Sequence, residues 1–292
     1  MQTPDTGRRY GEVFDRGYQH YDGQRLGRRH AIAALVLYSM KRAVGIKKGI
    51  GSKVIPILLY IGVAIPVVVS IGVRAFVPNA DLLGYPNLFG IVFVIEGIFI
   101  ATIAPEMLCG DRRENVLPLY FSRAITRADY LLAKLLATGL LALTISLVPA
   151  LIMWLGLQLL ATRPLLAMRD NSGDLGDVLV AGTMYALFLG AIGLLISSLT
   201  GRKSIAVGII ILGFGISEGL AATLTAVLDD DQPLRRFVLF ISPSTTSAAL
   251  IGRLFNERIV DSDVGLGWIL AVMLGIVLLC WGVMYWRYVP ND

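Results

Sequence analysis

Residues 54–73 read VIPILLYIGVAIPVVVSIGV, an apolar run without a charged side chain that is bounded by Lys53 and Arg74. A helix needs about 20 apolar residues to cross the hydrocarbon core of a bilayer, because each residue advances the helix by about 1.5 Å. The run meets this requirement. It predicts a transmembrane helix, and it gives the pattern against which the rest of the chain can be compared.

The same pattern recurs along most of the chain. The predicted spans lie at about 54–76, 88–108, 131–160, 177–200, 205–228 and 264–286. Of the 292 residues, 55% are apolar and only 16% are charged, whereas soluble domains carry about a quarter charged residues. The mean hydropathy is +0.70. Barrel strands would alternate apolar and polar residues over about ten positions, and this alternation is absent. The sequence therefore predicts an all-α polytopic membrane protein, with a six-helix transmembrane domain over residues 51–288.

Lysine and arginine are distributed unevenly among the loops. If the N-terminus is cytoplasmic, the inner segments contain 19 of the 26 basic residues and the outer segments contain 7. Cytoplasmic loops of membrane proteins carry the excess of basic residues. We therefore expect both termini to be cytoplasmic.

Two apolar segments are too short to cross a bilayer. Residues 31–40 form an apolar run with basic residues at both ends, and they predict an amphipathic helix in the inner headgroup layer within a cytoplasmic N-terminal region, 1–50. A soluble helix docked on the membrane domain is the alternative. Residues 237–260 contain a proline between two apolar stretches, and they predict a short re-entrant or surface helix pair at the outer leaflet.

The inner loop 109–130 contains the most distinctive sequence. Residues 114–134 read ENVLPLYFSRAITRADYLLAK. Asp129 suits the first turn of a helix that continues into the third span, and Thr126 suits its cap. On composition alone, the loop is a solvated, basic inner loop.

The order of residues in this loop resembles the permease subunits of ABC-2 type transporters. The similarity covers residues 106–135 closely, except that Ala124 stands where the family often has proline. The six-span layout extends it over most of the chain, and residues 17–25 (GYQHYDGQR) are similar to the leader of a bacterial subgroup. The resemblance implies the ABC-2, type V exporter-like, permease fold.

The resemblance also implies partners. Two permease chains would pair with two ATP-binding cassette ATPase subunits, and the loop 109–130 would contain the coupling helix that sits in a groove of the ATPase. The hairpin turn at 201–204 is a second expected contact. The expected ATPase-coupling residues are Arg112, Arg113, Glu114, Leu117, Pro118, Tyr120, Arg123, Arg127, Arg202 and Lys203.

The chain itself offers no ATP-hydrolysing motif. A P-loop requires the pattern G-x-x-x-x-G-K-[ST], and the nearest fragment, Gly201-Arg202-Lys203-Ser204, lacks the first glycine. No set of nucleophile, base and metal ligands converges, and the two histidines, His20 and His30, lack zinc-type spacing. We expect no catalytic residue, no metal and no cofactor on this chain, with ATP and Mg on the partner ATPase.

Three carboxyl groups lie within the predicted spans. Ionisable groups in a membrane are costly and usually face a cavity or a partner. Glu96 and Glu218 are candidates for the substrate path or for a dimer contact, although a hydrogen-bonded structural role is the alternative. Glu106 lies near the inner face, where we expect it to pair with Arg112 or Arg113.

Two helical stripes of small residues mark places where helices can approach closely. One contains Gly215 and Gly219 in the fifth span, and the other contains Gly182, Ala186 and Gly190 in the fourth. ABC-2 relatives pair through their first and fifth spans, so the resemblance makes Gly215 and Gly219 the candidates for the dimer seam. Packing within one chain is the alternative.

The function expected from the sequence is that of the transmembrane permease subunit of an ATP-binding cassette exporter. It would be a multi-pass protein of the bacterial cytoplasmic (plasma) membrane, paired with a second permease as a homodimer or heterodimer and with no nucleic-acid partner. A six-span scaffold or assembly protein that does not transport is the alternative. An intramembrane enzyme is disfavoured, and the sequence does not select a cargo.

Overall fold

The computed structural model describes residues 27–46, 49–77, 83–114, 120, 125–228, 235–257, 259–260 and 264–288. This part of the chain contains six helices that are long and apolar enough to cross a membrane. They are α2 (Gly51–Phe76), α3 (Tyr85–Arg113), α5 (Arg127–Leu159), α7 (Ser172–Leu199), α8 (Lys203–Val227) and α11 (Leu266–Tyr288). Each predicted span falls on one of these helices, so the prediction of an all-helical, six-span membrane protein is confirmed.

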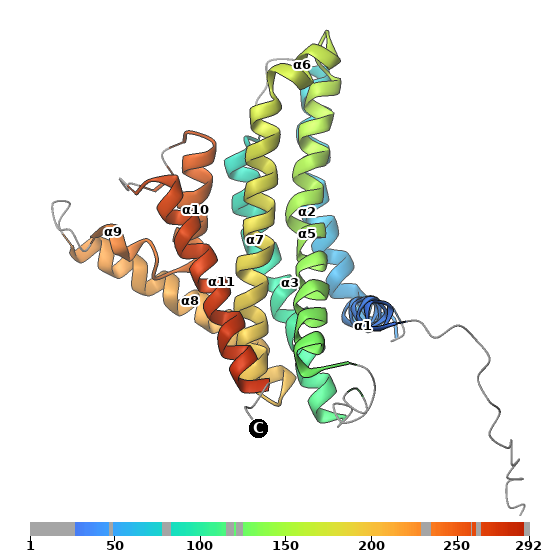
Figure 1. The fold of residues 1–292 in the computed structure, drawn as a ribbon. Coiled ribbons are helices and arrows are strands. Elements are labelled where there is room, and N and C mark those ends of the chain that lie inside the picture. Colours follow the sequence, from blue (N-terminus) through green and yellow to red (C-terminus); the bar gives the residue numbers. More distant parts are fainter. Residues whose placement is uncertain are drawn as a thin grey trace, which may run out of the picture.

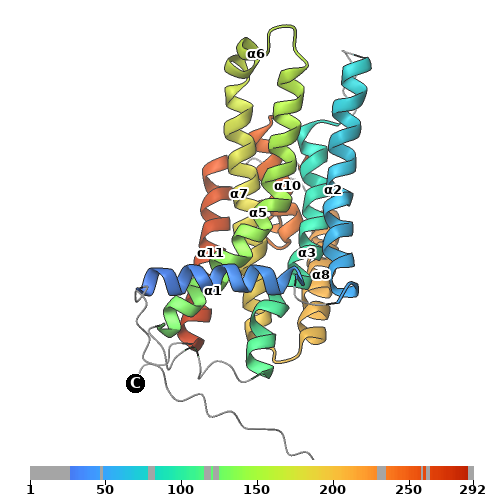
Figure 2. The same cartoon turned by 90° about the vertical axis from the view of Figure 1, so that its right-hand side faces the viewer.

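Four shorter helices complete the described fold: α1 (Arg28–Ala43), α6 (Pro164–Asp170), α9 (Arg235–Val238) and α10 (Pro243–Leu254). Helix α1 lies across the long helices instead of along them (Figure 2). Helix α6 joins α5 to α7 at the opposite end of the bundle (Figure 1). We call these two ends the α1 end and the α6 end.

The predicted short segments are helical. The run at 31–40 lies within α1, whose Leu35, Val36 and Ser39 side chains are buried against α5 and α3. The segment 237–260 forms the pair α9 and α10, and Pro243 is the first residue of α10, where its fixed φ and missing N–H are tolerated. Their depth in a bilayer stays a prediction.

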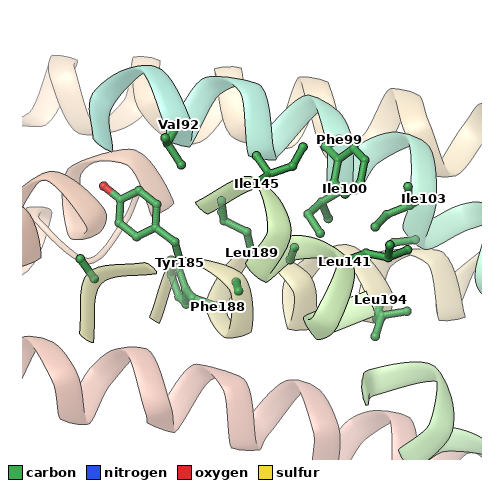
Figure 3. Packing of buried hydrophobic residues seen from close by; sticks show 14 of the residues in the cluster. Val92, Phe99, Ile100, Ile103, Leu141, Ile145, Tyr185, Phe188, Leu189 and Leu194 are labelled. Carbon is green, nitrogen blue, oxygen red and sulfur yellow. The ribbon is translucent and has the colours of Figure 1, made fainter. Parts of the chain in front are cut away.

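Helices α3, α5 and α7 form the centre of the molecule. Their apolar side chains interdigitate, as Phe99 and Ile100 of α3, Ile145 of α5 and Leu189 of α7 show in Figure 3. All four of these side chains are fully buried. Helices α1 and α2 pack on α5, α8 packs on α3, and α11 packs on α7. The central three helices therefore form a scaffold on which the other helices are mounted.

The C-terminal end of α11 lies at the α1 end. The Tyr288 ring is 6.3 Å from the ring of Tyr130 near the start of α5, and Arg28 at the start of α1 reaches Asp129 on the same helix. The described beginning and end of the chain thus share one end of the bundle, as Figure 1 also shows. This arrangement suits two termini on one side of the membrane, and the assignment of that side to the cytoplasm stays a prediction.

Candidate functional site

The start of α5 is fixed by a capping box. The Asp129 backbone N–H donates to Thr126 Oγ1 at 3.2 Å, and the Thr126 backbone N–H donates to Asp129 Oδ2 at 3.0 Å. The predicted roles of these two residues are confirmed. Arg28 then donates from Nε and Nη2 to the two carboxylate oxygens of Asp129, at 2.8 and 2.7 Å. The start of α1 is thereby tied to the start of α5.

A buried carboxylate lies at the centre of the α1 end. The Asp111 side chain is fully buried and is contacted from three directions. Arg42 Nη1 of α1 lies 2.9 Å from Oδ1, and Lys134 Nζ of α5 lies 2.8 Å from Oδ2. The Tyr130 hydroxyl donates to Oδ2 at 2.9 Å. Because buried charges are tolerated only when they are paired and hydrogen-bonded, this cluster holds α1, α3 and α5 in one relative position.

Arg42 extends the cluster to two more carboxylates. Its Nη2 donates to Glu114 Oε1 at 2.7 Å, and its Nε lies 3.7 Å from Glu106 Oε1. Burial alone would lower the pKa of Arg42, but Asp111, Glu114 and Glu106 outweigh it, so the pKa lies above its ordinary value. Arg42 therefore stays charged and holds α1 on the end of α3.

Sequence reasoning did not assign Arg42, Asp111 or Lys134 to any site. Arg42 resembled an ordinary basic flank of an apolar helix. Lys134 carried a usable signal, because a single cation between apolar residues at the start of a span requires a partner. The identity of that partner comes from residues far away in sequence, so the pattern alone could not supply it.

Arg112 and Arg113 are neighbours, but they face different surroundings. Arg112 Nη1 donates to the Ser198 carbonyl at 2.7 Å, and its guanidinium lies 4.8 Å from the centre of the Tyr288 ring. Arg113 has 76% of its side chain exposed. Of these two predicted coupling residues, Arg113 is the exposed one, and Arg112 joins the ends of α3, α7 and α11.

The expectation that Glu106 pairs with Arg112 or Arg113 is wrong. Glu106 Oε2 accepts from Lys203 Nζ at 2.8 Å, at the start of α8. Six positions along a helix turn Arg112 about 120° around the axis from Glu106, so the two side chains lie on different faces. Arg113 lies about 10 Å along the axis from Glu106. The Glu106 pair therefore connects α3 to α8.

A hollow of about 730 Å³ opens at this end. Its lining includes three of the predicted coupling residues, Arg113, Arg202 and Lys203, together with Glu106 and Val207. The turn before α8 and the end of α3 thus meet around one concave surface, although they are distant in sequence. A lining that combines basic groups with an apolar residue suits a docked protein segment.

The remaining predicted coupling residues divide into two groups. Tyr120 lies 5.9 Å from Tyr130, ring to ring, and burial, followed by the Asp111 carboxylate, raises the pKa of Tyr120 to about 12. Arg127 is the exposed first residue of α5. Leu117, Pro118 and Arg123 lie outside the described residues.

The two carboxyl groups proposed for the path or the seam lie in opposite surroundings. Glu96 is fully buried in α3, and neither of its oxygens has a hydrogen-bond partner among the described residues. Glu218 is exposed on α8 and accepts a hydrogen bond from Ser242 at 2.7 Å. Of these two carboxyl groups, Glu218 is the one that lies on an outer face of the chain.

The Gly215 and Gly219 stripe is open in the single chain. A Cβ atom built on either glycine would meet nothing within 4 Å. Packing within one chain therefore does not explain this stripe among the described residues. The assignment of Gly215 and Gly219 to a dimer seam stays a prediction.

Six apolar helices in the described part of the chain, with α1 lying across them, define a multi-pass helical membrane protein. The chain matches the ABC-2 family transporter protein over residues 8–291, and it therefore belongs to that family. A search of curated proteins gave no match. Family membership makes this chain a permease component.

Proposed function

We propose that this chain is the permease subunit of an ATP-driven exporter in the cytoplasmic membrane of a bacterium, paired with a second permease chain. Separate ATP-binding cassette subunits would bind ATP and Mg and hydrolyse the nucleotide. The observation that carries the proposal is the hollow between α3 and the turn before α8 in a chain of the ABC-2 family. On this proposal the α1 end faces the cytoplasm.

The contacts around the hollow suggest how a docked ATPase would move the membrane helices. The Glu106–Lys203 pair joins the end of α3 to the start of α8. The Arg42–Asp111 pair joins the same end of α3 to α1. A movement of the docked ATPase at the hollow would thus displace α3 of the central scaffold and α8 together. Helix α8 carries the open glycine stripe.

The test is purification of the tagged full chain in mild detergent with its native partners, followed by an ATPase assay of the eluate. The test variant combines Arg113→Glu with Arg202→Glu, which reverses two exposed charges at the hollow. The control combines Arg163→Glu with Arg169→Glu, which reverses two exposed charges at the α6 end. Neither pair takes part in the buried Asp111 cluster.

We expect the wild type and the control to retain a copurifying ATPase and the test variant to lose most of it. If all three preparations contain equal ATPase, the hollow is not the docking surface. If the wild-type chain is isolated alone and inactive from several detergents, the exporter proposal fails and a non-transporting scaffold gains support.

A further inference from the structure

Glu218 differs from every other charged residue in the described spans. The exposed charged residues of these helices are otherwise Arg113, Arg127, Lys203 and Arg287, and each lies at or next to a helix end. Glu218 lies about nine residues before the end of α8, which is about 13 Å along the axis. An exposed carboxylate at that depth is too costly to face lipid, so its face must be covered by protein or by water.

The surroundings of Glu218 on α8 are small or apolar. Ile211, Gly215 and Ala222 lie on the same stripe of the helix, and all three are exposed. The two glycines on either side, Gly215 and Gly219, leave open space around the carboxylate. The carboxylate is therefore the one charged group on this stripe of α8, whose other residues are small or apolar.

A contact from α10 fixes the orientation of this carboxylate. The Ser242 hydroxyl donates to Glu218 Oε2 at 2.7 Å and accepts from the Ser244 backbone N–H at 3.2 Å. Ser242 is fully buried, so its hydroxyl cannot turn freely to solvent. One carboxylate oxygen is held by the protein, and no described residue donates a hydrogen bond to the other, Oε1.

No cation of this chain neutralises Glu218 in the described structure, where its one polar partner is a hydroxyl group. A second copy would not supply a cation from the interior of its described spans either, because Lys and Arg are exposed there only at helix ends. If the second permease chain of the proposed function is another copy that pairs through the α8 stripe, as the family resemblance predicts, the two Glu218 carboxylates approach the same seam. On this arrangement, no described residue within the spans balances the two carboxylates, so a bound cation would complete the seam.

We infer that Glu218 recognises the positive charge of an organic cation with a large apolar body, and that this is the class of cargo which the permease takes. The inference rests on the proposed function. The exposed Ile211, which lies on the same stripe of α8 as Glu218, would contact the apolar body in the space left open at Gly215. Glu218, held by Ser242, would contact the cationic centre, because opposite charges in a partly apolar setting attract strongly.

The test uses two probe ions of matched shape and opposite charge, tetraphenylphosphonium and tetraphenylborate. Binding of each ion to the purified full chain in lipid nanodiscs is measured by equilibrium dialysis, with empty nanodiscs subtracted. The variants are Glu218→Gln, which keeps the shape and removes the charge, and Glu218→Asp, which keeps the charge. Glu257→Gln removes the same charge from an exposed position outside the spans and serves as the control.

The wild type, Glu218→Asp and Glu257→Gln are expected to bind the cation at least about ten-fold more tightly than the anion, whereas Glu218→Gln loses this preference. Equal binding of the two ions by the wild type, or a cation preference unchanged in Glu218→Gln, would overturn the inference. Should Glu218→Gln fail to fold, the wild-type preference and its retention in Glu218→Asp decide the question. Copurification of an ATPase is scored separately, so a chain that keeps its ATPase but shows no cation preference refutes only the cargo assignment.

Discussion

Helices α7 and α8 are adjacent in the chain and similarly apolar, yet they occupy different surroundings. In the most apolar window of each helix, 56% of α7 is buried within the chain but only 17% of α8. Both helices carry small residues at helical spacing. A Cβ atom on Gly182 of α7 would lie 3.0 Å from the Leu147 Cα, and Ser146 donates to the Gly182 carbonyl at 2.9 Å. On α8, the corresponding space at Gly215 and Gly219 is empty.

The difference shows that a small-residue stripe predicts close approach without identifying the partner. In α7 the partner is α5 of the same chain. In α8 no described residue of the chain fills the space at the glycines, so the same pattern leaves room for a second copy or for cargo. The packed helices α3, α5 and α7 and the open helix α8 should therefore respond differently to substitution.

The largest expected effect lies in the packed part of the molecule, at Asp111. Asp111→Asn should reduce the free energy of unfolding by about 4 kcal/mol, because it leaves the buried Lys134 without its anionic partner and removes the fully buried partner of Arg42. Glu114→Gln removes a 45%-exposed partner of the same Arg42 and should cost less than about 1 kcal/mol. Thermal unfolding can be followed by a thiol-reactive dye, since Cys109 and Cys280 are both buried. Equal losses in the two variants would contradict the assignment of the buried cluster.

The next effect tests the two stripes directly. Gly182→Leu in α7 should destabilise the chain by about 2 to 3 kcal/mol, because the added side chain overlaps the backbone of α5. Gly215→Leu in α8 should change the unfolding free energy by less than about 0.5 kcal/mol. The same dye assay measures both variants. A stable Gly182→Leu chain would show that α5 and α7 can separate at no cost.

A smaller effect should appear in self-association. Gly215→Leu and Gly219→Leu should each weaken the pairing of two permease chains by about ten-fold, because the larger side chains keep the helices apart. Analytical ultracentrifugation in density-matched detergent measures the pairing. Unchanged pairing in both variants would move the dimer seam away from α8.

The smallest effect concerns the first turns of α5 and α8. Thr126→Ala should reduce stability by about 1 kcal/mol, because it removes the side-chain half of the capping box. Arg202→Ala should have almost no effect on stability, because the Arg202 side chain does not cap α8. Dye-monitored unfolding again distinguishes the two variants. A large loss of stability in Arg202→Ala would reveal a structural role for the turn before α8.

The sequence predicted the features that depend on local composition. The six spans, the helix at 31–40 and the Thr126 cap each follow from neighbouring residues, and each is present in the structure. The observed helix bounds differ from the predicted spans where polar residues extend an apolar helix. Helix α3, for example, continues past the predicted end at 108 to Arg113. Helix α6 was not predicted, because Pro164–Asp170 is too short to show a period.

The features that depend on distant contacts were not predictable in the same way. Arg42 and Asp111 are 69 positions apart, and nothing in either segment specifies the other. The Lys203–Glu106 pair spans 97 positions, so the expected local pair with Arg112 was a reasonable but incorrect choice. Glu96 and Glu218 look equivalent in sequence, and only their burial separates them.

The contact between α1 and α5 also constrains how the protein is made. Arg28 and Asp129 are 101 positions apart, and a ribosome adds residues at about 5 to 20 per second. The first helix therefore emerges roughly 5 to 20 s before the helix on which it docks. During that interval, α2 and α3 can enter the bilayer while α1 waits at its surface. The helix synthesised first can reach its place only after the insertion of α5.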